Sequence, residues 1–266
     1  MRGAWRSYVA AQLRFDPVTI FMRGALIDWR TELRQEVGET SMNVFPLRFS
    51  ALLLMLTLIG VSACSAGERD HVALPSPSID LPLAARPAEQ TAVVAGGCFW
   101  GIQAVFQHVK GVISATSGYA GGSAKTAEYE VVSTGSTGHA ESVRITYDPS
   151  QVTYGQLLRV FFSVAHDPTQ FDRQGPDQGS QYRSAIFYST DEQKRIAEAY
   201  IAQLEKAKAF SRPIVTQVVQ LQGFFPAEAY HQDYAAHHPN DPYIVYNDAP
   251  KVANLQREFP ELYKGK

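Results

Sequence analysis

The stretch TAVVAGGCFWGIQAVFQHV, residues 91–109, contains a change of hydrophobic period. Residues 91–95 form a short continuous apolar run that ends at Gly96 and Gly97, which is typical of a buried strand followed by a tight turn. After the turn, apolar residues recur at intervals of three and four, which is typical of a helix. The stretch therefore predicts a strand, a tight turn and a helix, with Cys98 where the helix begins.

The rest of the chain after this stretch continues to alternate strand and helix patterns. Apolar patterning predicts further strands at residues 112–119, 142–147, 183–188 and 213–221. Helical spacing predicts helices at residues 153–164 and 191–209. This order predicts an α+β fold with a ferredoxin-like split β-α-β core, an additional helix, an additional strand and long loops. The loops are marked by glycines at residues 118–138 and 174–179, and long loops on a rigid scaffold often hold functional sites.

Composition excludes several classes of protein. The chain has 266 residues, of which 45% are hydrophobic, so it can bury a core of ordinary size. Its net charge of -2 gives no attraction to nucleic acid, and we predict no nucleic-acid partner. Two cysteines, Cys64 and Cys98, are too few for a disulfide scaffold and form no Cys-x-x-Cys pair.

An apolar run near the N-terminus resembles an export signal. Residues 49–63 carry no charge but fall short of the about 20 residues that a membrane-spanning helix needs. The run follows Met42 and Arg48 and ends in small residues before Cys64, as a signal peptide does. Its end resembles a bacterial lipobox, which implies cleavage before Cys64 and acylation of that cysteine. A core helix of a larger fold is the alternative.

The signal peptide implies a division of the chain into four parts. Residues 1–41 have mixed charges in no export pattern, and we interpret them as an upstream extension outside the natural protein, with translation beginning at Met42. Residues 42–63 are then the signal peptide. Residues 64–90, rich in Pro, Ser and Ala, read as a lipid-anchored linker, and residues 91–266 as the folded domain.

Cys98 lies where its chemistry would be altered by the helix. The free N–H groups and the dipole at a helix N-terminus favour a thiolate, which is a nucleophile. A buried, inert cysteine is the alternative, since free cysteines are commonly buried. A phosphate-binding loop is excluded, because Gly101 is followed by Ile102 and Gln103 instead of Lys and Ser or Thr.

Short motifs that occur in one order along the chain carry a family resemblance. They are GGCFWG at 96–101, GYAGG at 118–122, YEV at 129–131, TGHAE at 137–141, HDP at 166–168, DQGSQYRS at 177–184, AYHQDY at 229–234 and FPELY at 259–263. With them the chain resembles the type A peptide methionine sulfoxide reductases from about residue 91 to its C-terminal tail. The resemblance implies that residues 91–266 are a methionine sulfoxide reductase catalytic domain without a cofactor.

The resemblance also implies a reaction. Cys98 attacks the sulfur of the S epimer of methionine sulfoxide, free or in a peptide, releases methionine and is left as a sulfenic acid. Glu141 matches the acid of the family that protonates the leaving oxygen, for which burial would have to raise its pKa.

Five further residues match substrate-binding positions of the family. Tyr129 and Tyr182 match phenols that bind the sulfoxide oxygen, and Asp177 matches a residue that orders that polar side. Phe99 and Trp100 match the apolar wall for the S-methyl group. Taken singly, each has an ordinary structural interpretation as a loop aromatic, a solvated carboxylate or a core residue.

The chain departs from the family pattern in its cysteines. Cys98 is the last cysteine, and Ser133 stands where some members have one. An acylated Cys64 could not resolve a sulfenic acid, so we predict reduction by an external thioredoxin-, glutaredoxin- or glutathione-like thiol. Gln103 stands where many members have Glu, which affects only charge pairing within the helix.

The hypothesis that unites these features is a monomeric, membrane-anchored lipoprotein of the cell envelope, facing the periplasm or the outside. It would repair oxidised methionine in exported proteins and peptides. Two alternatives stay open: a sulfoxide-binding lipoprotein without turnover, and a cysteine hydrolase that uses Cys98 and His139. His231, His237 and His238 have no accompanying ligand set, so we expect them on a solvated loop or helix end and predict no metal.

Overall fold

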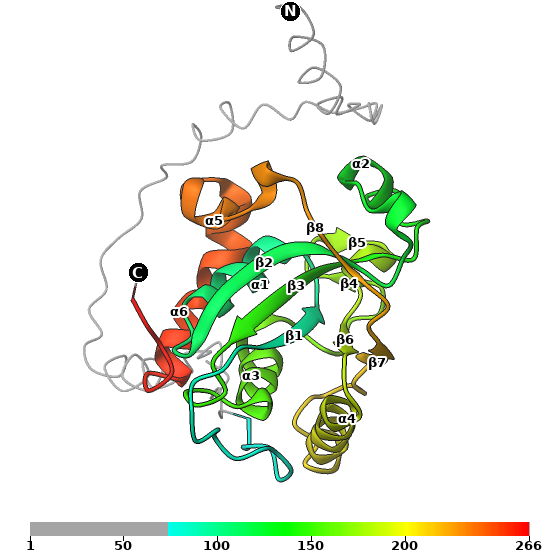
Figure 1. Ribbon diagram of the computed structural model, residues 1–266. Helices are drawn as coiled ribbons and strands as arrows, with labels where there is room; N and C mark the ends of the chain where they lie inside the picture. The colour runs from blue at the N-terminus through cyan, green and yellow to red at the C-terminus, as the bar shows by residue number, and fades with distance from the viewer. Residues whose placement is uncertain (1–73, 266) are drawn as a thin grey trace, which may run out of the picture. The chain divides into compact units, whose positions relative to one another are not determined.

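The computed structural model describes residues 74–265 (Figure 1). The predicted upstream extension at 1–41, the signal peptide at 42–63, the lipidation site Cys64 and the linker up to residue 73 lie outside the described residues. Those interpretations therefore stay predictions.

Four strands and two helices form the core in the predicted order. They are β1 (Gln90–Ala95), α1 (Phe99–Gln107), β2 (Val112–Ala120), β3 (Ala140–Tyr147), α3 (Tyr154–Val160) and β6 (Ala185–Tyr188). The strands lie in the order β6-β1-β3-β2, and each is antiparallel to its neighbour. This is the arrangement of a ferredoxin-like core, so the predicted fold class is confirmed.

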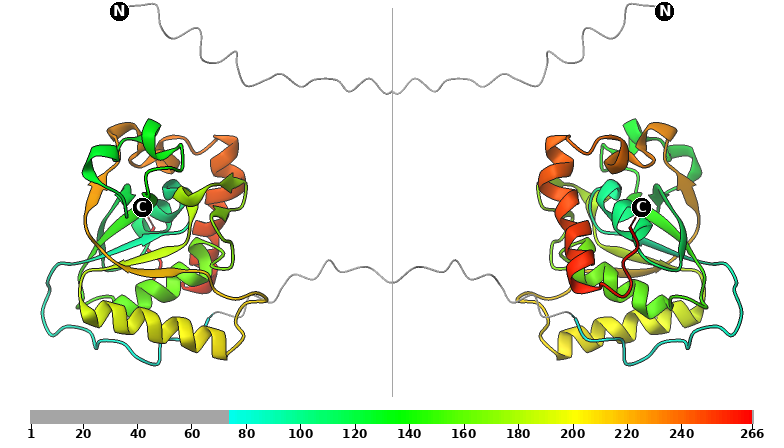
Figure 2. Two further views of the ribbon diagram at one scale, coloured as in Figure 1. Left: turned by 90° about the vertical axis from the view of Figure 1, so that its right-hand side faces the viewer. Right: turned by 90° about the vertical axis from the view of Figure 1, so that its left-hand side faces the viewer.

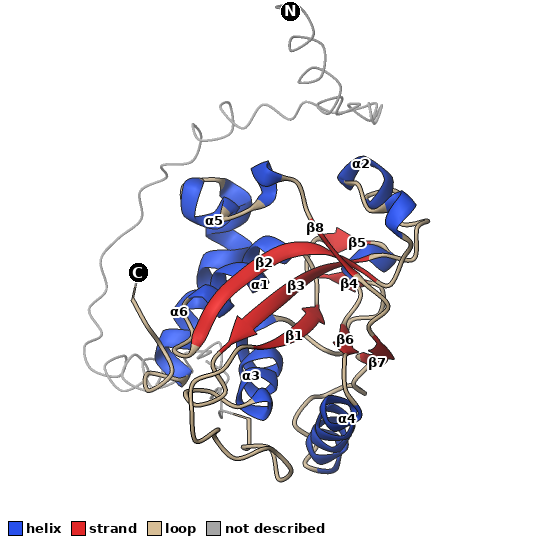
Figure 3. Cartoon of the chain, in the orientation of Figure 1, coloured by secondary structure: helices blue, strands red, loops and turns tan. Residues whose placement is uncertain are grey.

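The sheet is extended at both edges (Figure 3). The predicted additional helix α4 (Asp191–Lys206) leads to β7 (Gln217–Gln220), which pairs in parallel with β6. At the other edge, β8 (Phe224–Pro226) pairs with the end of β2 and was not predicted, because its three residues end in a proline. A separate two-stranded sheet joins β4 (Arg173–Gln174) and β5 (Asp177–Gln178) in the second glycine-marked loop.

The main core lies between one face of the sheet and four helices. Alternate residues of β1 point to opposite faces, so that Ala92 and Val94 join the main core while Val93 and Ala95 join a small second cluster on the other face. α1, α3, α4 and a C-terminal helix, α6 (Ala249–Glu258), contribute buried side chains to the main core. Figure 2 shows the course of α4 in yellow and of α6 in orange-red. The sheet therefore packs mainly on one face, and the end of β1 leads directly to the start of α1.

Short helices fill the connections. They are η1 (Ala124–Thr126), α2 (Tyr129–Val132), the π-turn η2 (Phe161–Ala165), η3 (Ser180–Tyr182), η4 (Ala229–His231), α5 (Tyr234–His237) and the π-turn η5 (Ile244–Asp248). The helix predicted at 153–164 is thus α3 continued by η2. Most of the other short elements surround the start of α1, as the next subsection shows.

Residues 74–89, which we name the strap, were predicted as part of a linker but lie against the domain. Arg159 Nε donates to the Leu74 carbonyl at 2.6 Å, and Tyr200 donates its hydroxyl hydrogen to the Pro75 carbonyl at 2.9 Å. Asp80 accepts hydrogen bonds from the Thr153 hydroxyl and from the Gly155 N–H at the start of α3. The proline-rich composition correctly indicated a segment without helix or strand, but not that the domain binds it.

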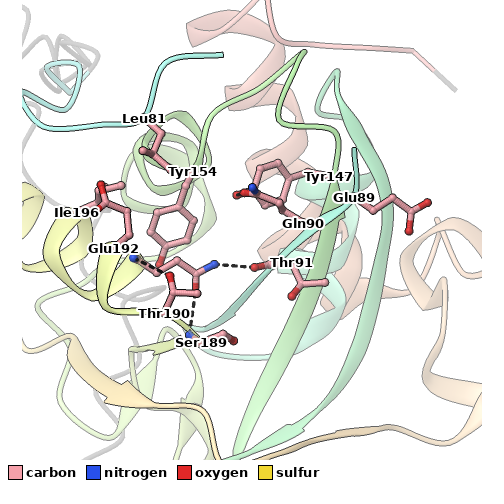
Figure 4. Close-up of a pocket in the computed structure, with 11 residues that line it drawn as sticks. Leu81, Glu89, Gln90, Thr91, Tyr147, Tyr154, Ser189, Thr190, Glu192 and Ile196 are labelled. Carbon is pink, nitrogen blue, oxygen red and sulfur yellow. Dashed lines mark hydrogen bonds between the residues drawn. The ribbon is translucent and has the colours of Figure 1, made fainter. Parts of the chain in front are cut away.

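A hollow of about 340 Å³ lies where the strap meets β1, α3 and α4 (Figure 4). Leu81, Tyr154 and Ile196 supply apolar walls, and Gln193 crosses it to donate to the Thr91 carbonyl at 2.8 Å. None of the lining residues is a predicted site residue. Separately, no helix within residues 74–265 is long and apolar enough to cross a membrane.

Candidate active site

Two glycines place Cys98 at the first residue before α1. Gly97 has φ +100°, a conformation that side-chain-bearing residues rarely adopt. At Gly96 a Cβ would come within 2.7 Å of the ring of His166, so the chain can turn only because this position has no side chain. The turn carries Cys98 from the end of β1 to the N-cap position of α1, where 8% of its surface is exposed.

The charge state of Cys98 is set by opposing influences. Burial raises its pKa well above the ordinary value, and the negative charges of Glu141 and Asp248 raise it further. The Trp100 N–H and the Lys251 ammonium act in the opposite direction. Contrary to the expectation from sequence, the helix N-terminus does not by itself make the resting thiol acidic, because burial beside carboxylates outweighs it.

Glu141 comes from β3 and meets the same turn of α1. Its Oε2 accepts a hydrogen bond from the Phe99 N–H at 3.0 Å, and only 3% of its surface is exposed. Burial raises the pKa of Glu141 to about 8, although the bond from Phe99 lowers it. The carboxyl group is therefore largely protonated at neutral pH, as the predicted acid requires.

Tyr129 and Tyr182 approach this carboxyl group from α2 and η3. Burial, followed by the negative charge of Glu141, raises the pKa of Tyr129 to about 12 and raises that of Tyr182 also. Both phenols thus stay protonated and can donate hydrogen bonds. Tyr129 is held in place through its backbone N–H, which donates to Glu228 Oε1 at 2.9 Å.

Asp177 lies at the polar side of the site on β5. It accepts a hydrogen bond of 2.5 Å from the hydroxyl group of Tyr243, a residue that the sequence did not single out. Burial raises the pKa of Asp177, while the bond from Tyr243 lowers it. Asp177 and Tyr243 therefore form a fixed polar pair beside the two phenols.

The two aromatic residues after Cys98 have different environments. Phe99 is 1% exposed, and its ring lies 5.1 Å from that of His231 and 6.0 Å from that of Tyr119. Trp100 is half-buried and stacks on Tyr234 with ring centroids 3.8 Å apart. Phe99 therefore belongs to the core beneath the site, and Trp100 with Tyr234 forms its apolar wall.

The structure brings all seven predicted catalytic and substrate-binding residues to one region around the start of α1, from five different elements. Their roles remain predictions. Sequence reasoning missed four residues that complete the region: Tyr234, Tyr243, Asp248 and Lys251. The first lies in the motif at 229–234, so it could have been found there, whereas the other three follow in an unassigned C-terminal segment.

The histidines depart from expectation in one case. His231 is buried, with 2% of its surface exposed, and not on a solvated loop as predicted; it packs among Phe99, Tyr129 and Tyr230. Burial lowers its pKa, which keeps the ring neutral and compatible with that apolar setting. His237 and His238 are exposed, as expected.

His139 is engaged away from Cys98. Its Nδ1 accepts a hydrogen bond from the Gly122 N–H at 3.2 Å, which leaves Nε2 to donate to the Ser123 carbonyl at 2.9 Å. With both ring nitrogens occupied, His139 has none with which to take the proton of Cys98. This disfavours the hydrolase alternative. Within the described part of the chain, no three His, Cys, Asp or Glu side chains lie close enough together to hold a metal ion.

Known proteins resemble this chain in sequence. A family model described as peptide methionine sulfoxide reductase matches residues 90–262. A protein of Mesorhizobium japonicum named peptide methionine sulfoxide reductase MsrA 2 is 63% identical over 182 residues, which cover 68% of this chain and 93% of that protein. Its namesake from Synechocystis is 50% identical over 193 residues, covering 72% of this chain and 90% of that protein.

Two solved structures are similar in fold. Methionine sulfoxide reductase A of Corynebacterium diphtheriae superposes with a TM-score of 0.50 at 32% identity, covering 66% of this chain and 91% of that one. The reduced form of Mxr1 from Saccharomyces cerevisiae superposes with a TM-score of 0.52 at 28% identity, covering 62% of this chain and 92% of that one.

Proposed function

The chain belongs to the peptide methionine sulfoxide reductase family, oxidoreductases that act on methionine sulfoxide, and we propose that it reduces the S epimer through a sulfenic acid on Cys98. The observation that carries this proposal is the buried carboxyl group of Glu141 at the turn that holds Cys98. Its pKa of about 8 makes it a proton donor at neutral pH, next to a sulfur that must act as a nucleophile.

The two groups depend on each other. A negative Glu141 raises the pKa of Cys98, so the thiol loses its proton more easily while Glu141 keeps its own. The reactive form therefore has one negative charge, on sulfur, and one proton, on Glu141. The Cys98 sulfur attacks the sulfoxide sulfur, and Glu141 gives its proton to the oxygen. This attack forms an S–S bond to a sulfur that now carries a hydroxyl group. The hydroxyl group passes to the Cys98 sulfur as the S–S bond and the original S–O bond break, so that the sulfoxide sulfur gains two electrons and leaves as methionine, while the Cys98 sulfur loses two and becomes a sulfenic acid.

The surrounding residues select and orient the sulfoxide. Tyr129 and Tyr182 are donors that can bind the oxygen as negative charge builds on it. Trp100, stacked on Tyr234, offers an aromatic face to the S-methyl group. Donors on one side and an aromatic wall on the other fix the oxygen and the methyl group. With the direction of attack by Cys98 fixed as well, only one configuration at sulfur leaves the rest of the substrate room to extend away from the site, and this underlies the proposed choice of the S epimer.

Turnover requires a thiol from outside the domain. No cysteine follows Cys98, and it is the one free cysteine in residues 74–265. We propose that a thioredoxin-, glutaredoxin- or glutathione-like thiol attacks the sulfenic acid, forming a mixed disulfide and releasing water. A second thiol then frees the Cys98 thiol and forms the disulfide of the donor.

We also propose that the enzyme is a monomer anchored to a membrane of the cell envelope through an acylated Cys64, where it repairs exported proteins. The uncharged run at 49–63 before that cysteine supports this. The test is the intact mass of the protein purified from cell membranes. We expect a chain that begins at Cys64 and carries acyl groups, and a mass that retains residues 1–63 would refute the anchor.

The catalytic proposal is tested with the full chain carrying Cys64→Ser, in which Cys98 is the only thiol. It is incubated with excess dithiothreitol and with the separated S and R epimers of a methionine sulfoxide peptide, beside the same chain carrying Cys98→Ser as well. We expect many turnovers on the S epimer alone and none in the second variant. Binding of the peptide without turnover would support the sulfoxide-binding alternative and overturn the proposal.

A further inference from the structure

A buried ion pair lies against the first turn of α1. Asp248 ends η5 and leads into α6, and no part of its surface is exposed. Its Oδ1 lies 3.0 Å from Nζ of Lys251, one turn further along α6. A Cβ on Gly101 would overlap Asp248 Oδ1 and come within 2.7 Å of Lys251 Nζ. The pair therefore touches the backbone of α1 three residues after Cys98.

This pair is poorly built for stability alone. The second carboxylate oxygen of Asp248, Oδ2, is buried and has no hydrogen-bond partner among residues 74–265. A buried ion pair repays the loss of hydration only when its remaining lone pairs are satisfied, and apolar residues of similar volume usually pack at least as well. The position of the pair therefore calls for an explanation in terms of its charges.

Those charges act on Cys98 among a defined set of neighbours. The ionisable groups that act on the sulfur are Glu141 of β3, Tyr129 of α2, Tyr182 of η3, Tyr234 of α5, Tyr243, and the pair itself. Asp177 of β5 acts on Glu141 and on Asp248. Lys251 is the cation in this set. Burial, Glu141 and Asp248 raise the pKa of Cys98, whereas the Trp100 N–H and Lys251 lower it.

We propose that Asp248 and Lys251 are positioning residues that set how readily Cys98 becomes a thiolate, with Lys251 favouring the anion and Asp248 both holding Lys251 and moderating its effect. The inference rests on the proposed function of Cys98 as the nucleophile. It assigns to α6 a part in the chemistry. Helix α1 contains no Lys or Arg and meets the buried carboxyl group of Glu141 at its start, so Lys251 of α6 supplies the positive charge near Cys98.

The proposal predicts changes of opposite sign. Lys251→Met leaves a buried carboxylate beside the sulfur, so thiolate formation becomes harder, whereas Asp248→Asn leaves an unpaired ammonium group, so it becomes easier. We expect the midpoint of thiolate formation to move by about one pH unit in each direction, which is about tenfold in the thiolate present at a fixed pH. Lys251→Arg keeps the positive charge, so its midpoint of thiolate formation should equal that of the parent chain. The double variant with Asp248→Asn and Lys251→Met should have a midpoint close to that of the parent chain.

The measurement is the rate at which iodoacetamide alkylates Cys98 from neutral to alkaline pH, followed by mass, in the full chain carrying Cys64→Ser. The rate follows the thiolate fraction and needs no sulfoxide. Arg257→Met is the matched control, since Arg257 lies on the same helix with its side chain 56% exposed, and it should leave the curve unchanged. Thermal melting of each variant verifies that it is folded.

Two shifts of opposite sign in folded variants support the proposal. Shifts of the same sign, a shift in only one single variant, or none would overturn it, since a merely structural pair would not move the thiol in two directions. Failure of the proposed function would show separately, as absence of sulfoxide reduction by the chain with Cys64→Ser alone while the alkylation curves remain measurable.

Discussion

Helices α1 and α3 begin in contrasting ways. At α3, Thr153 and Gln156 cap each other's backbone N–H groups, and Asp80 of the strap accepts a further bond from the Gly155 N–H at 2.9 Å. At α1, the N-cap residue is Cys98, its side chain makes no capping bond, and the first turn has no acidic residue. The Phe99 N–H of α1 donates instead to the buried carboxyl group of Glu141.

The contrast shows two uses of the same unpaired N–H groups. At α3 they are satisfied by side chains that stabilise the helix, and α4 follows this rule, with Thr190 accepting from the Gln193 N–H and acidic residues in its first turn. At α1 they hold reactive groups in place, and the helix depends on packing against the sheet for its stability. Substitutions at the start of α1 should therefore lower activity, whereas substitutions at the capped starts of α3 and α4 should lower the free energy of unfolding.

The largest effect is expected at Glu141. Glu141→Gln keeps the size of the side chain and its acceptor for the Phe99 N–H, but removes the proton donor. We expect kcat for S-sulfoxide reduction to fall by about 10²- to 10⁴-fold with the protein still folded. Retention of full activity in Glu141→Gln would exclude this residue as the acid.

The pH dependence of the same residue sharpens the comparison. The pKa of Glu141 is about 8 in the folded protein, above the ordinary value of a carboxyl group in the unfolded chain. Glu141 therefore stabilises the folded protein fully at pH below that ordinary value, and this stabilisation is lost as the pH rises to about 8. Activity should fall at higher pH, around 8, where Glu141 of the folded enzyme loses its proton. At pH above 8, Glu141→Gln should raise the Tm by about 5 °C relative to the parent, and little at pH below 5. Equal melting curves at both pH values would contradict a raised pKa.

The phenols should show a smaller and non-additive effect. Tyr129→Phe and Tyr182→Phe each leave one donor for the sulfoxide oxygen, so we expect about a tenfold loss of kcat/KM in each and about a thousandfold loss in the double variant. Steady-state kinetics on the S epimer measures this. A loss of only about a hundredfold in the double variant, the product of the two single losses, would mean that the two phenols act independently and not on the same atom.

Substitutions at the start of α3 should lower stability and leave activity unchanged. Thr153→Ala and Asp80→Ala each remove capping bonds, and we expect each to lower the free energy of unfolding by about 1 kcal/mol without a change in kcat. Urea unfolding and the sulfoxide assay on the same samples test this. Thr190→Ala at α4 is the matched control for loss of an ordinary cap. A loss of activity larger than the loss of folded protein would show that the strap reaches the active site.

Sequence patterns were sufficient for the core because it follows local rules of hydrophobic period, whereas the candidate site residues came from the resemblance to a family. The change of period around Gly96 and Gly97 placed Cys98 at the start of a helix, and the ordered motifs supplied Glu141 and the phenols. Burial was harder to predict. The residues next to His231 in sequence do not indicate that it is buried. A helix start lowers the pKa of a thiol, and the sequence does not show that burial raises the pKa of Cys98 instead.

The features that were missed depend on contacts between distant segments. Asp80 caps a helix more than seventy residues later in the sequence, and Asp248 contacts Gly101, which lies far from it in the sequence. Their own neighbourhoods in sequence show an ordinary linker and an ordinary acidic residue before a helix. Such roles are set by the tertiary fold, which no periodicity encodes.

The strap also limits where an anchored enzyme can work. Nine residues separate the proposed anchor Cys64 from Leu74, the first residue that the structure describes, and a chain of that length reaches at most about 36 Å. In Figures 1 and 2 the strap lies at the end of the molecule that carries α3 and α4, whereas α2 and α5, which wall the site, lie at the other end. If Cys64 carries the proposed lipid anchor, this tether would keep the domain within a few tens of ångströms of the lipid surface. The oxidised methionines that it could reach would then be those on proteins at or near the membrane.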